Sequence, residues 1–435
     1  MMKALTRILC IPLATLAVVL PAHAQLRIEI TSGVTDPIPI AIVPFTPAAP
    51  ADGGTDVAGI VQRDLEGSGR FKALPRAQMS VKPTRAEEVV INEWRGSGTD
   101  YIVVGRLSSA ADGQLAVDFD LINVLNGQKL ATQRFTATAA SLRNAAHRVS
   151  DVVYQKILGV RGAFATSIAY VSVTGQAPAQ RYKLFVADTD GENRRMVLES
   201  GQPIMSPAWS ADGQWLAYVS FESKRSAIFV QKLRTGERRK VSARVGINGA
   251  PAWSPDGRKL ALTLGGSGGN PDIYVLDLGT QALTRITEDP SIDTEPVWSP
   301  DGASLYFTSD RAGGPQIYQV SASAGARPKR ITFGGSYNAR PRLSPDGTLL
   351  AVVTLDQGNY RVGVQDLSNG TLRVLSKGRQ DESPSFAPNG ATLIYSGQER
   401  GRAALAMVST DGLTGQRLNS DEGQVREPVW GPFAQ

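Results

Sequence analysis

The stretch that decides the fold is Pro251-Ala-Trp-Ser-Pro-Asp-Gly257, because related versions of it recur along the C-terminal two-thirds of the chain. Ser-Pro-Asp-Gly favours a type I turn, since Pro presets φ at the second position and Asp and Gly suit the third and fourth. The copies begin at prolines 43 to 45 residues apart: Pro207, Pro251, Pro296, Pro341, Pro384 and Pro428. A period of about 44 residues is typical of a four-stranded propeller blade.

The two ends of this repeat predict how the ring closes. An apolar second strand occurs six times, near Ile168, Leu216, Leu260, Leu305, Leu350 and Leu393. The first has no Pro-x-Trp strand before it, and the last Pro-x-Trp, Pro428 to Trp430, has no strands after it. We therefore predict a six-bladed all-β propeller over residues 163–435. Its C-terminal strand completes the blade begun by three N-terminal strands, which removes open sheet edges.

The N-terminus has the layout of an export signal. Lys3 and Arg7 precede the uncharged run Ile8–Leu20, and Ala22-His-Ala24 is an A-x-A cleavage site. The apolar run is too short to span a bilayer. We predict that residues 1–24 are a signal peptide, that cleavage falls between Ala24 and Gln25, and that the mature chain resides in the periplasm.

Composition narrows the possible chemistry. The 435 residues contain one cysteine, Cys10, and two histidines, His23 and His147, so the mature chain keeps only His147. A disulfide framework and a Cys/His metal site are thereby excluded. The net charge of +6 is mild and no long basic run occurs, so nucleic acid is not an expected partner.

Residues 37–158 predict a separate α/β domain, joined to the propeller by a linker over residues 159–162. Strands are expected at 38–43, 101–107, 115–121 and 129–135, and helices at 57–67, 84–96 and 142–157. The first helix is capped by Asp56, and Thr84-Arg-Ala-Glu87 is a capping box for the second. Asp118 and Asp120 alternate with apolar residues, which predicts one wet sheet face.

The sequence offers little for catalysis. Gly265-Gly-Ser267-Gly-Gly269 matches G-x-S-x-G, but it lies between two expected strands, whereas a nucleophile elbow needs a strand-to-helix turn. We expect His147 to lie on the solvated face of its helix. The chain is therefore predicted not to be an enzyme and to need no cofactor. Two alternatives stay open: a periplasmic propeller hydrolase or lyase with its site in the channel, and calcium bound by channel carboxylates.

Variation within the repeat points to a binding surface. The Trp-Ser-Pro-Asp-Gly elements are interpreted as blade architecture. The segments just before each Pro-x-Trp differ from blade to blade, and divergent sequence on a repeated frame is where an asymmetric partner can be recognised.

Several stretches match a known family. Ile40-Ala-Ile-Val-Pro-Phe45, Gly159-Val-Arg-Gly-Ala-Phe164, Asn248-Gly-Ala-Pro251 and Asp381-Glu-Ser-Pro384, with the export signal and the six blades, resemble the TolB family of Tol–Pal systems. The resemblance covers the mature chain. It implies a non-enzymatic, monomeric adaptor that supports outer-membrane integrity and envelope constriction during division, and that meets membranes only through its partners.

The resemblance also implies two partner sites. The propeller channel mouth would bind the lipoprotein Pal, and a mobile N-terminal segment, residues 25–36, would bind TolA; other outer-membrane proteins and bacteriocins are further expected partners. The Pal-side candidates are Ile247, Asn248, Ala250, Thr294, Glu295, Arg340 and Glu382. Ile247 stands where well-known members have a histidine, so an apolar contact is expected there. The TolA-side candidates are Leu26, Arg27, Ile28, Glu29, Ile30 and Gly33.

The residues themselves support the second site. Leu26 to Gly33 alternates like a strand, with Gly33 as the expected hinge. Such a strand can pair with another protein's sheet edge or pack on its own domain. Switching between these states would couple the two partner sites.

Overall fold

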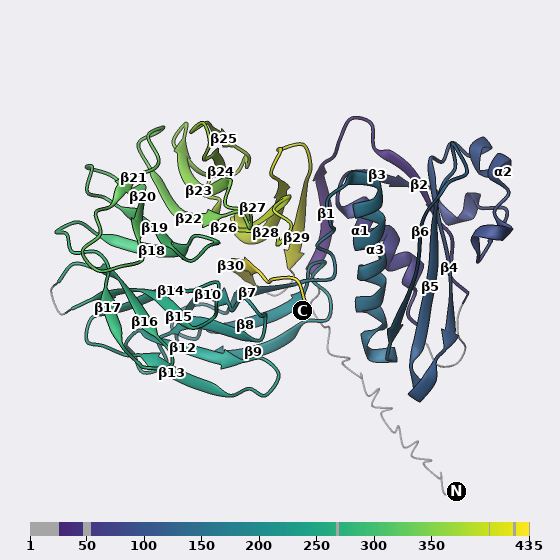
Figure 1. Ribbon diagram of the computed structural model, residues 1–435. Helices are drawn as coiled ribbons and strands as arrows, with labels where there is room; N and C mark the ends of the chain where they lie inside the picture. The colour runs from purple at the N-terminus through teal and green to yellow at the C-terminus, as the bar shows by residue number, and fades with distance from the viewer. Residues whose placement is uncertain (1–25, 47–53, 267–268, 400, 421–422, 435) are drawn as a thin grey trace, which may run out of the picture.

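The computed structural model describes residues 26–46, 54–266, 269–399, 401–420 and 423–434. An α/β domain and a β-propeller lie side by side (Figure 1). The predicted signal peptide, with Ala24 and Gln25, lies outside the described residues. Among the helices that are described, none has the length and apolar character needed to cross a bilayer.

The α/β domain is built on one five-stranded sheet. Its strand order is β3 (Phe71–Ala73), β2 (Ile38–Ile42), β4 (Tyr101–Ser109), β5 (Leu115–Asn123) and β6 (Lys129–Ala137). β2 is parallel to both neighbours, and β4, β5 and β6 are antiparallel. Helices α1 (Val57–Gly67) and α3 (Leu142–Leu158) bury their apolar stripes against one face. Asp56 caps α1 as predicted, since its Oδ1 accepts the Gly59 N–H at 2.9 Å.

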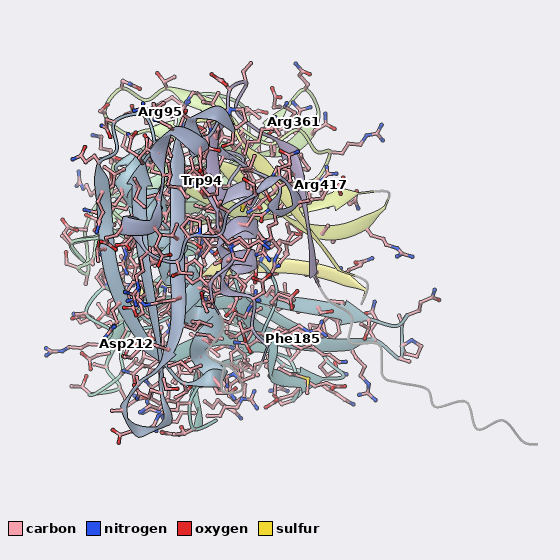
Figure 2. The ribbon with its side chains drawn as sticks, turned by 90° about the vertical axis from the view of Figure 1, so that its right-hand side faces the viewer. Trp94, Arg95, Phe185, Asp212, Arg361 and Arg417 are labelled. Atoms are coloured by element: carbon pink, nitrogen blue, oxygen red, sulfur yellow. The ribbon has the colours of Figure 1, made fainter. Side chains whose placement is uncertain are left out.

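The opposite face of this sheet is covered, so the prediction of a wet face is wrong. Residues 74–97 cross it and form a second core with Trp94, Ile102 and Ile122 (Figure 2). Asp120 is 8% exposed; its carboxylate accepts the Ala86 N–H at 3.1 Å. The alternating pattern was produced by a carboxylate whose hydrogen bonds are met inside the protein.

The covering segment is also less helical than predicted. The 3-10 turns η1 (Arg76–Gln78) and η2 (Ala86–Glu88) precede a short helix, α2 (Ile91–Gly96). Val89 and Val90 between them are extended, because β-branched residues disfavour the helix and Val89 packs into the second core. Thr84 is bonded by Glu88 and not by Glu87, so the predicted capping box is wrong.

The propeller consists of six sheets around a channel, as predicted. The remaining short turns are η3 (Ala111–Gly113) and η4 (Ala139–Ser141). From the innermost strand outward, the blades are β30 (Gln424–Trp430), β7 (Ser167–Thr174), β8 (Arg181–Asp188), β9 (Arg195–Ser200); β10 (Ile204–Trp209), β11 (Trp215–Ser220), β12 (Ala227–Lys232), β13 (Arg238–Ser242); β14 (Ile247–Trp253), β15 (Lys259–Gly265), β16 (Asp272–Asp277), β17 (Leu283–Arg285); β18 (Asp293–Trp298), β19 (Ser304–Ser309), β20 (Gln316–Ser321), β21 (Lys329–Arg330); β22 (Asn338–Leu343), β23 (Leu349–Asp356), β24 (Asn359–Asp366), β25 (Leu372–Val374); and β26 (Glu382–Phe386), β27 (Thr392–Glu399), β28 (Arg402–Ser409), β29 (Gly415–Ser420). The C-terminal strand β30 pairs with β7 and closes the ring.

Each innermost strand runs between two different ends of the propeller. It begins at the end we call the mouth end, where loops arrive from the outermost strand of the preceding blade. It finishes at the turn end, at Ser-Pro-Asp-Gly. There Ser254 Oγ donates to Asp256 Oδ1 at 2.5 Å, and Gly257 N donates to Ser254 O at 2.9 Å. Gly257 has φ of +70°, which favours glycine over any residue with a Cβ.

The repeated tryptophans tie neighbouring blades together. Trp209 Nε1 donates to Val429 O at 3.2 Å, Trp253 Nε1 to Ala208 O at 3.2 Å, and Trp298 Nε1 to Ala252 O at 3.1 Å. In each pair the acceptor lies on the innermost strand of the preceding blade. The repeat is therefore architectural, as the sequence predicted.

The α/β domain docks on the turn end of the propeller. Arg143 of α3 donates through Nε to Asp188 Oδ2 at 3.0 Å and also contacts Asp190. The Asn389 Nδ2 donates to Arg161 O at 2.8 Å, from the turn between β26 and β27. The mouth end is thus left free of the second domain.

Candidate functional site

All six innermost strands share a backbone irregularity at the mouth end. The register with the second strand shifts just before each repeated proline, as a β-bulge. The residue before each proline has φ between +43° and +57°, although none is glycine: Ser206, Ala250, Glu295, Arg340, Ser383 and Glu427. Such a conformation is sparsely populated by residues with a Cβ, and here the fold imposes it six times. The bulge turns six unlike side chains toward the channel.

These side chains line a channel cavity of about 210 Å³ together with Arg342. Its charges are paired. Arg340 Nε lies 3.1 Å from Glu295 Oε1, and Glu295 Oε2 accepts the Arg340 N–H at 2.9 Å. Arg340 also donates to Ser383 Oγ, and Glu427 accepts the Ser206 N–H. Burial lowers the pKa of Arg340, but Glu295, Glu427 and Glu382 outweigh it and raise that pKa, so Arg340 stays charged.

A second hollow, which we call the mouth hollow, opens where the channel meets the surface. It has a volume of about 600 Å³. Five of the seven predicted Pal-side residues line it: Ile247, Ala250, Thr294, Glu295 and Arg340. Residues far apart in sequence therefore meet in one place. Glu382 does not line this hollow and is brought near it only through its charge on Arg340.

Asn248, also a predicted site residue, lies in the floor of the mouth hollow and is only 1% exposed. Its Oδ1 accepts from Ser242 Oγ at 2.6 Å and from Arg244 N at 2.9 Å, and its Nδ2 donates to Arg244 O at 2.7 Å. Asn248 therefore fixes the loop above it and is not available to a partner. The equivalent position is buried in every blade: Ile204, Asn248, Asp293, Asn338, Asp381 and Val425.

Exposed apolar side chains surround the mouth hollow, and the sequence analysis missed most of them. We call this set the apolar rim; it comprises Met205, Val245, Ile247, Ile292 and Phe333, which are 38%, 65%, 47%, 47% and 73% exposed. All lie at or just before the start of an innermost strand, so the propeller brings them to one edge. The signal was present as an apolar residue shortly before each Pro-x-Trp, but it is not distinguishable from a core residue without the fold.

The N-terminal segment forms β1 (Leu26–Ser32), which pairs antiparallel with β29 as a fifth strand of the last blade (Figure 1). Its first residue, Leu26, is opposite Ser420 toward the mouth end, and Ser32 is opposite Gly415 near the turn end. Ile30 is 50% exposed, and the backbone after Gly33 meets the α/β domain through Val34 N, which donates to Gly69 O at 3.1 Å. Of the predicted alternatives, the structure displays pairing within the chain, on the propeller.

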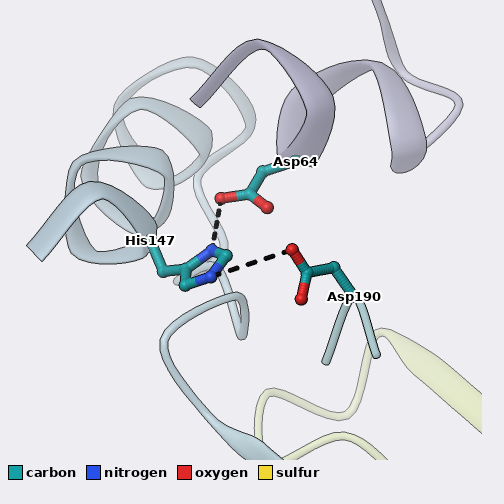
Figure 3. A group of neighbouring side chains, drawn as sticks. All are labelled: Asp64, His147 and Asp190. Atoms are coloured by element: carbon teal, nitrogen blue, oxygen red, sulfur yellow. Dashed lines mark hydrogen bonds and ion pairs between the residues drawn. The ribbon is translucent and has the colours of Figure 1, made fainter. Parts of the chain in front are cut away.

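His147 is buried, so its predicted position on a solvated helix face is wrong. Only 1% of it is exposed, because α1 and the turn after β8 cover that face of α3 (Figure 3). Nδ1 lies 2.8 Å from Asp64 Oδ2, and Nε2 lies 3.8 Å from Asp188 Oδ2 and 4.0 Å from Asp190 Oδ2. Burial opposes protonation, but Asp64, Asp188 and Asp190 outweigh it and raise the pKa of His147 to about 10.

This cluster resembles a catalytic or metal-binding group only in composition. Ser150 Oγ donates to Asp64 at 2.6 Å and not to the imidazole, so no nucleophile is activated. Asp64, His147 and Asp190 each offer a ligand atom within 4.8 Å of the others. The charges of the aspartates are, however, already paired with the imidazolium and with Arg143. We interpret the cluster as an ionic contact between the domains.

The G-x-S-x-G match lies between two strands, as expected. β15 ends at Gly265 and β16 begins at Asp272, while Ser267 lies outside the described residues. The local frame is a hairpin and not a strand-to-helix turn.

Comparison with known proteins covers both domains. Residues 26–130 match the family model of the TolB amino-terminal domain, and residues 154–434 match that of the TolB beta propeller domain. A Tol-Pal system protein TolB from Alcanivorax borkumensis is 49% identical over 97% of this chain and 96% of its own. One from Methylococcus capsulatus is 51% identical over 94% of this chain and 95% of its own. The crystal structure of TolB from Acinetobacter baumannii is 42% identical, with a TM-score of 0.86 over 94% of this chain and 100% of that one.

Proposed function

The chain belongs to the TolB family of Tol–Pal system proteins, and from that premise we propose that it is a non-enzymatic periplasmic adaptor. In this proposal the mouth hollow and its apolar rim bind Pal, and β1 binds TolA. The adaptor then supports outer-membrane integrity and envelope constriction during division. It needs no cofactor, because Arg340 already neutralises the carboxylates of the channel.

One observation carries the Pal assignment. Five side chains chosen from sequence line one hollow, surrounded by exposed apolar residues and opposite the end that holds the α/β domain. Partners gain most from apolar anchors in a hollow that surrounding polar groups complete. Ile247, 47% exposed, offers such an apolar contact. The loop that carries it is held by Asn248, so the surface is organised before a partner arrives.

The TolA assignment rests on the edge position of β1. It is the last strand of its sheet, so one edge of its backbone has no neighbouring strand among the described residues. TolA would bind either by adding a strand to that edge or by capturing β1 once it leaves β29. Because β1 begins toward the mouth end, Pal occupancy can influence its release. This coupling requires that saturating Pal change the TolA affinity; equal affinities would remove it.

The Pal assignment is tested by calorimetric titration of the mature chain with the periplasmic domain of Pal from the same organism. Thr294→Arg places a long cation in the mouth hollow and should abolish measurable binding. Thr284→Arg makes the same change on exposed β17 and serves as the matched control, which should bind like the wild type. Unfolding curves of both variants should coincide with the wild-type curve. A folded wild type that does not bind Pal would overturn the proposal.

A further inference from the structure

A strongly basic hairpin stands at the turn end of the second blade. It joins β12 to β13 over residues 232–240, and we call it the basic hairpin. In nine residues it has one acid, Glu237, and five bases: Lys232, Arg234, Arg238, Arg239 and Lys240. Arg195 of the preceding blade joins them, since its Nη1 donates to Leu233 O at 2.7 Å.

The positive charge of the whole chain is concentrated in this blade. Residues 204–246 contain eight Lys and Arg against three Asp and Glu, a net charge of +5 in a chain whose total is +6. The next blade, residues 247–292, has three bases and five acids. The surface is therefore a local feature and not a sample of the average composition.

Most of these charges are free to meet a partner. Arg234, Arg239 and Lys240 are exposed. Across the residues that the structure describes, Arg234 and Lys240 have no carboxylate within 4.0 Å, and Arg239 Nε is 3.6 Å from Glu237. Only Arg238 is firmly engaged, at 3.0 Å from Glu222. The basic hairpin thus presents uncompensated charge along an edge strand.

Edge strands often carry Lys or Arg to prevent sheet-to-sheet association, so that role must be weighed first. The other outer strands achieve it with fewer: β17 and β25 have one base each, and β21 has two. The basic hairpin exceeds this need. It also has an aromatic neighbour, Trp215, with the Arg239 guanidinium 4.9 Å and the Lys232 ammonium 5.6 Å from its ring.

We propose that the basic hairpin docks the propeller on a membrane surface bearing anionic phospholipid headgroups. Clusters of Lys and Arg beside an amphipathic aromatic ring suit a layer of phosphates, because the charges reach the headgroups while the ring lies at their boundary. A single pocketed anion fits less well, since the neighbouring hollow also contains Asp212, Asp256 and Asp277. Docking at the turn end leaves the mouth hollow open, and the inference does not depend on what the mouth binds.

The test is flotation of the mature chain with vesicles. The vesicles are either pure phosphatidylcholine or phosphatidylcholine with 30% phosphatidylglycerol, a composition chosen as a probe of roughly physiological anionic charge. We expect flotation with the anionic vesicles only, and its loss in high salt because the charges are screened. The triple variant Arg234→Glu, Arg239→Glu and Lys240→Glu should reduce the bound fraction at least about tenfold.

A matched triple variant separates local from total charge. Arg327→Glu, Lys377→Glu and Arg379→Glu change three exposed bases on other blades by the same amount and should bind within about twofold of the wild type. Equal loss in both triples would show diffuse attraction and overturn the proposal. Absence of wild-type flotation at low salt would also overturn it, and would leave an acidic protein as the class of partner to examine. Circular dichroism confirms that each variant is folded.

Discussion

The two ends of the innermost strands differ in which property is repeated. At the turn end, both sequence and geometry repeat: Ser-Pro-Asp-Gly turns and tryptophan hydrogen bonds recur from blade to blade. At the mouth end only the backbone repeats, with a bulge and a positive φ in all six blades, while the side chains range from Ala250 to Arg340. A propeller can thus hold its frame at one end and vary its recognition surface at the other.

The turn end should be the costly end to change. Trp298 is 7% exposed, and its loss in Trp298→Ala opens a cavity between blades and leaves Ala252 O without its donor. We expect the free energy of unfolding to fall by about 3–5 kcal/mol in urea titrations. Trp298→Phe, which keeps most of the volume, should lose only about 1 kcal/mol. If Trp298→Ala were as stable as Thr294→Arg, the two ends would not differ in the way described.

The domain contact at the turn end should respond to pH. The folded-state pKa of His147 is raised to about 10 from an unfolded value of 6.5, so its stabilising contribution is complete below pH 6.5 and is lost as pH rises toward 10. Wild type should therefore lose a few kcal/mol more than His147→Gln between pH 6 and pH 9.5, measured by denaturant unfolding. Parallel curves for the two proteins would contradict an imidazolium at this contact.

The mouth end should show a smaller but specific cost at its buried anchor. Asn248→Ala leaves Arg244 N and Arg244 O unpaired and should lower the free energy of unfolding by about 1–3 kcal/mol. Pal binding should weaken as well, because the loop of Ile247 is no longer fixed. Asn248→Asp keeps the two accepted hydrogen bonds and should retain most of both properties. An Asn248→Ala protein with normal stability would indicate that the loop is held by other groups.

The smallest effect is expected from metal. Because Arg340 pairs with Glu295 in the channel, we expect the melting temperature to be the same in millimolar calcium and in EDTA. A rise with calcium in the wild type that disappears in Glu295→Gln would instead show that the carboxylates hold a cation.

The local signals of the chain were enough for the frame. The spacing of the prolines predicted six blades, and the unpaired strands at the two ends predicted the closure by β30. Where the prediction was wrong, distant segments decided the outcome: α1 and the turn after β8 bury His147, and residues 74–97 bury Asp120. No periodicity within α3 or β5 contains that information.

The binding surface was predictable only in part. Candidate residues before Pro251 and Pro296 do meet in the mouth hollow, because the propeller brings equivalent loops to one edge. The burial of Asn248 depends on its hydrogen bonds to a loop four to six residues away, and the exposure of Phe333 depends on the absence of covering residues in the fold. Pairing of β1 with β29 joins positions almost 400 residues apart, and alternation in residues 26–33 does not specify a partner strand.

The most direct measurement is hydrogen exchange of the mature chain with and without the periplasmic domain of Pal. Our account predicts that Pal slows exchange in the mouth-end loops, residues 243–247, 289–293 and 333–337. The turn-end loops, residues 210–214, 254–258 and 299–303, should exchange at unchanged rates. Protection confined to the turn-end loops, or equal protection at both ends, would contradict the division between frame and recognition surface.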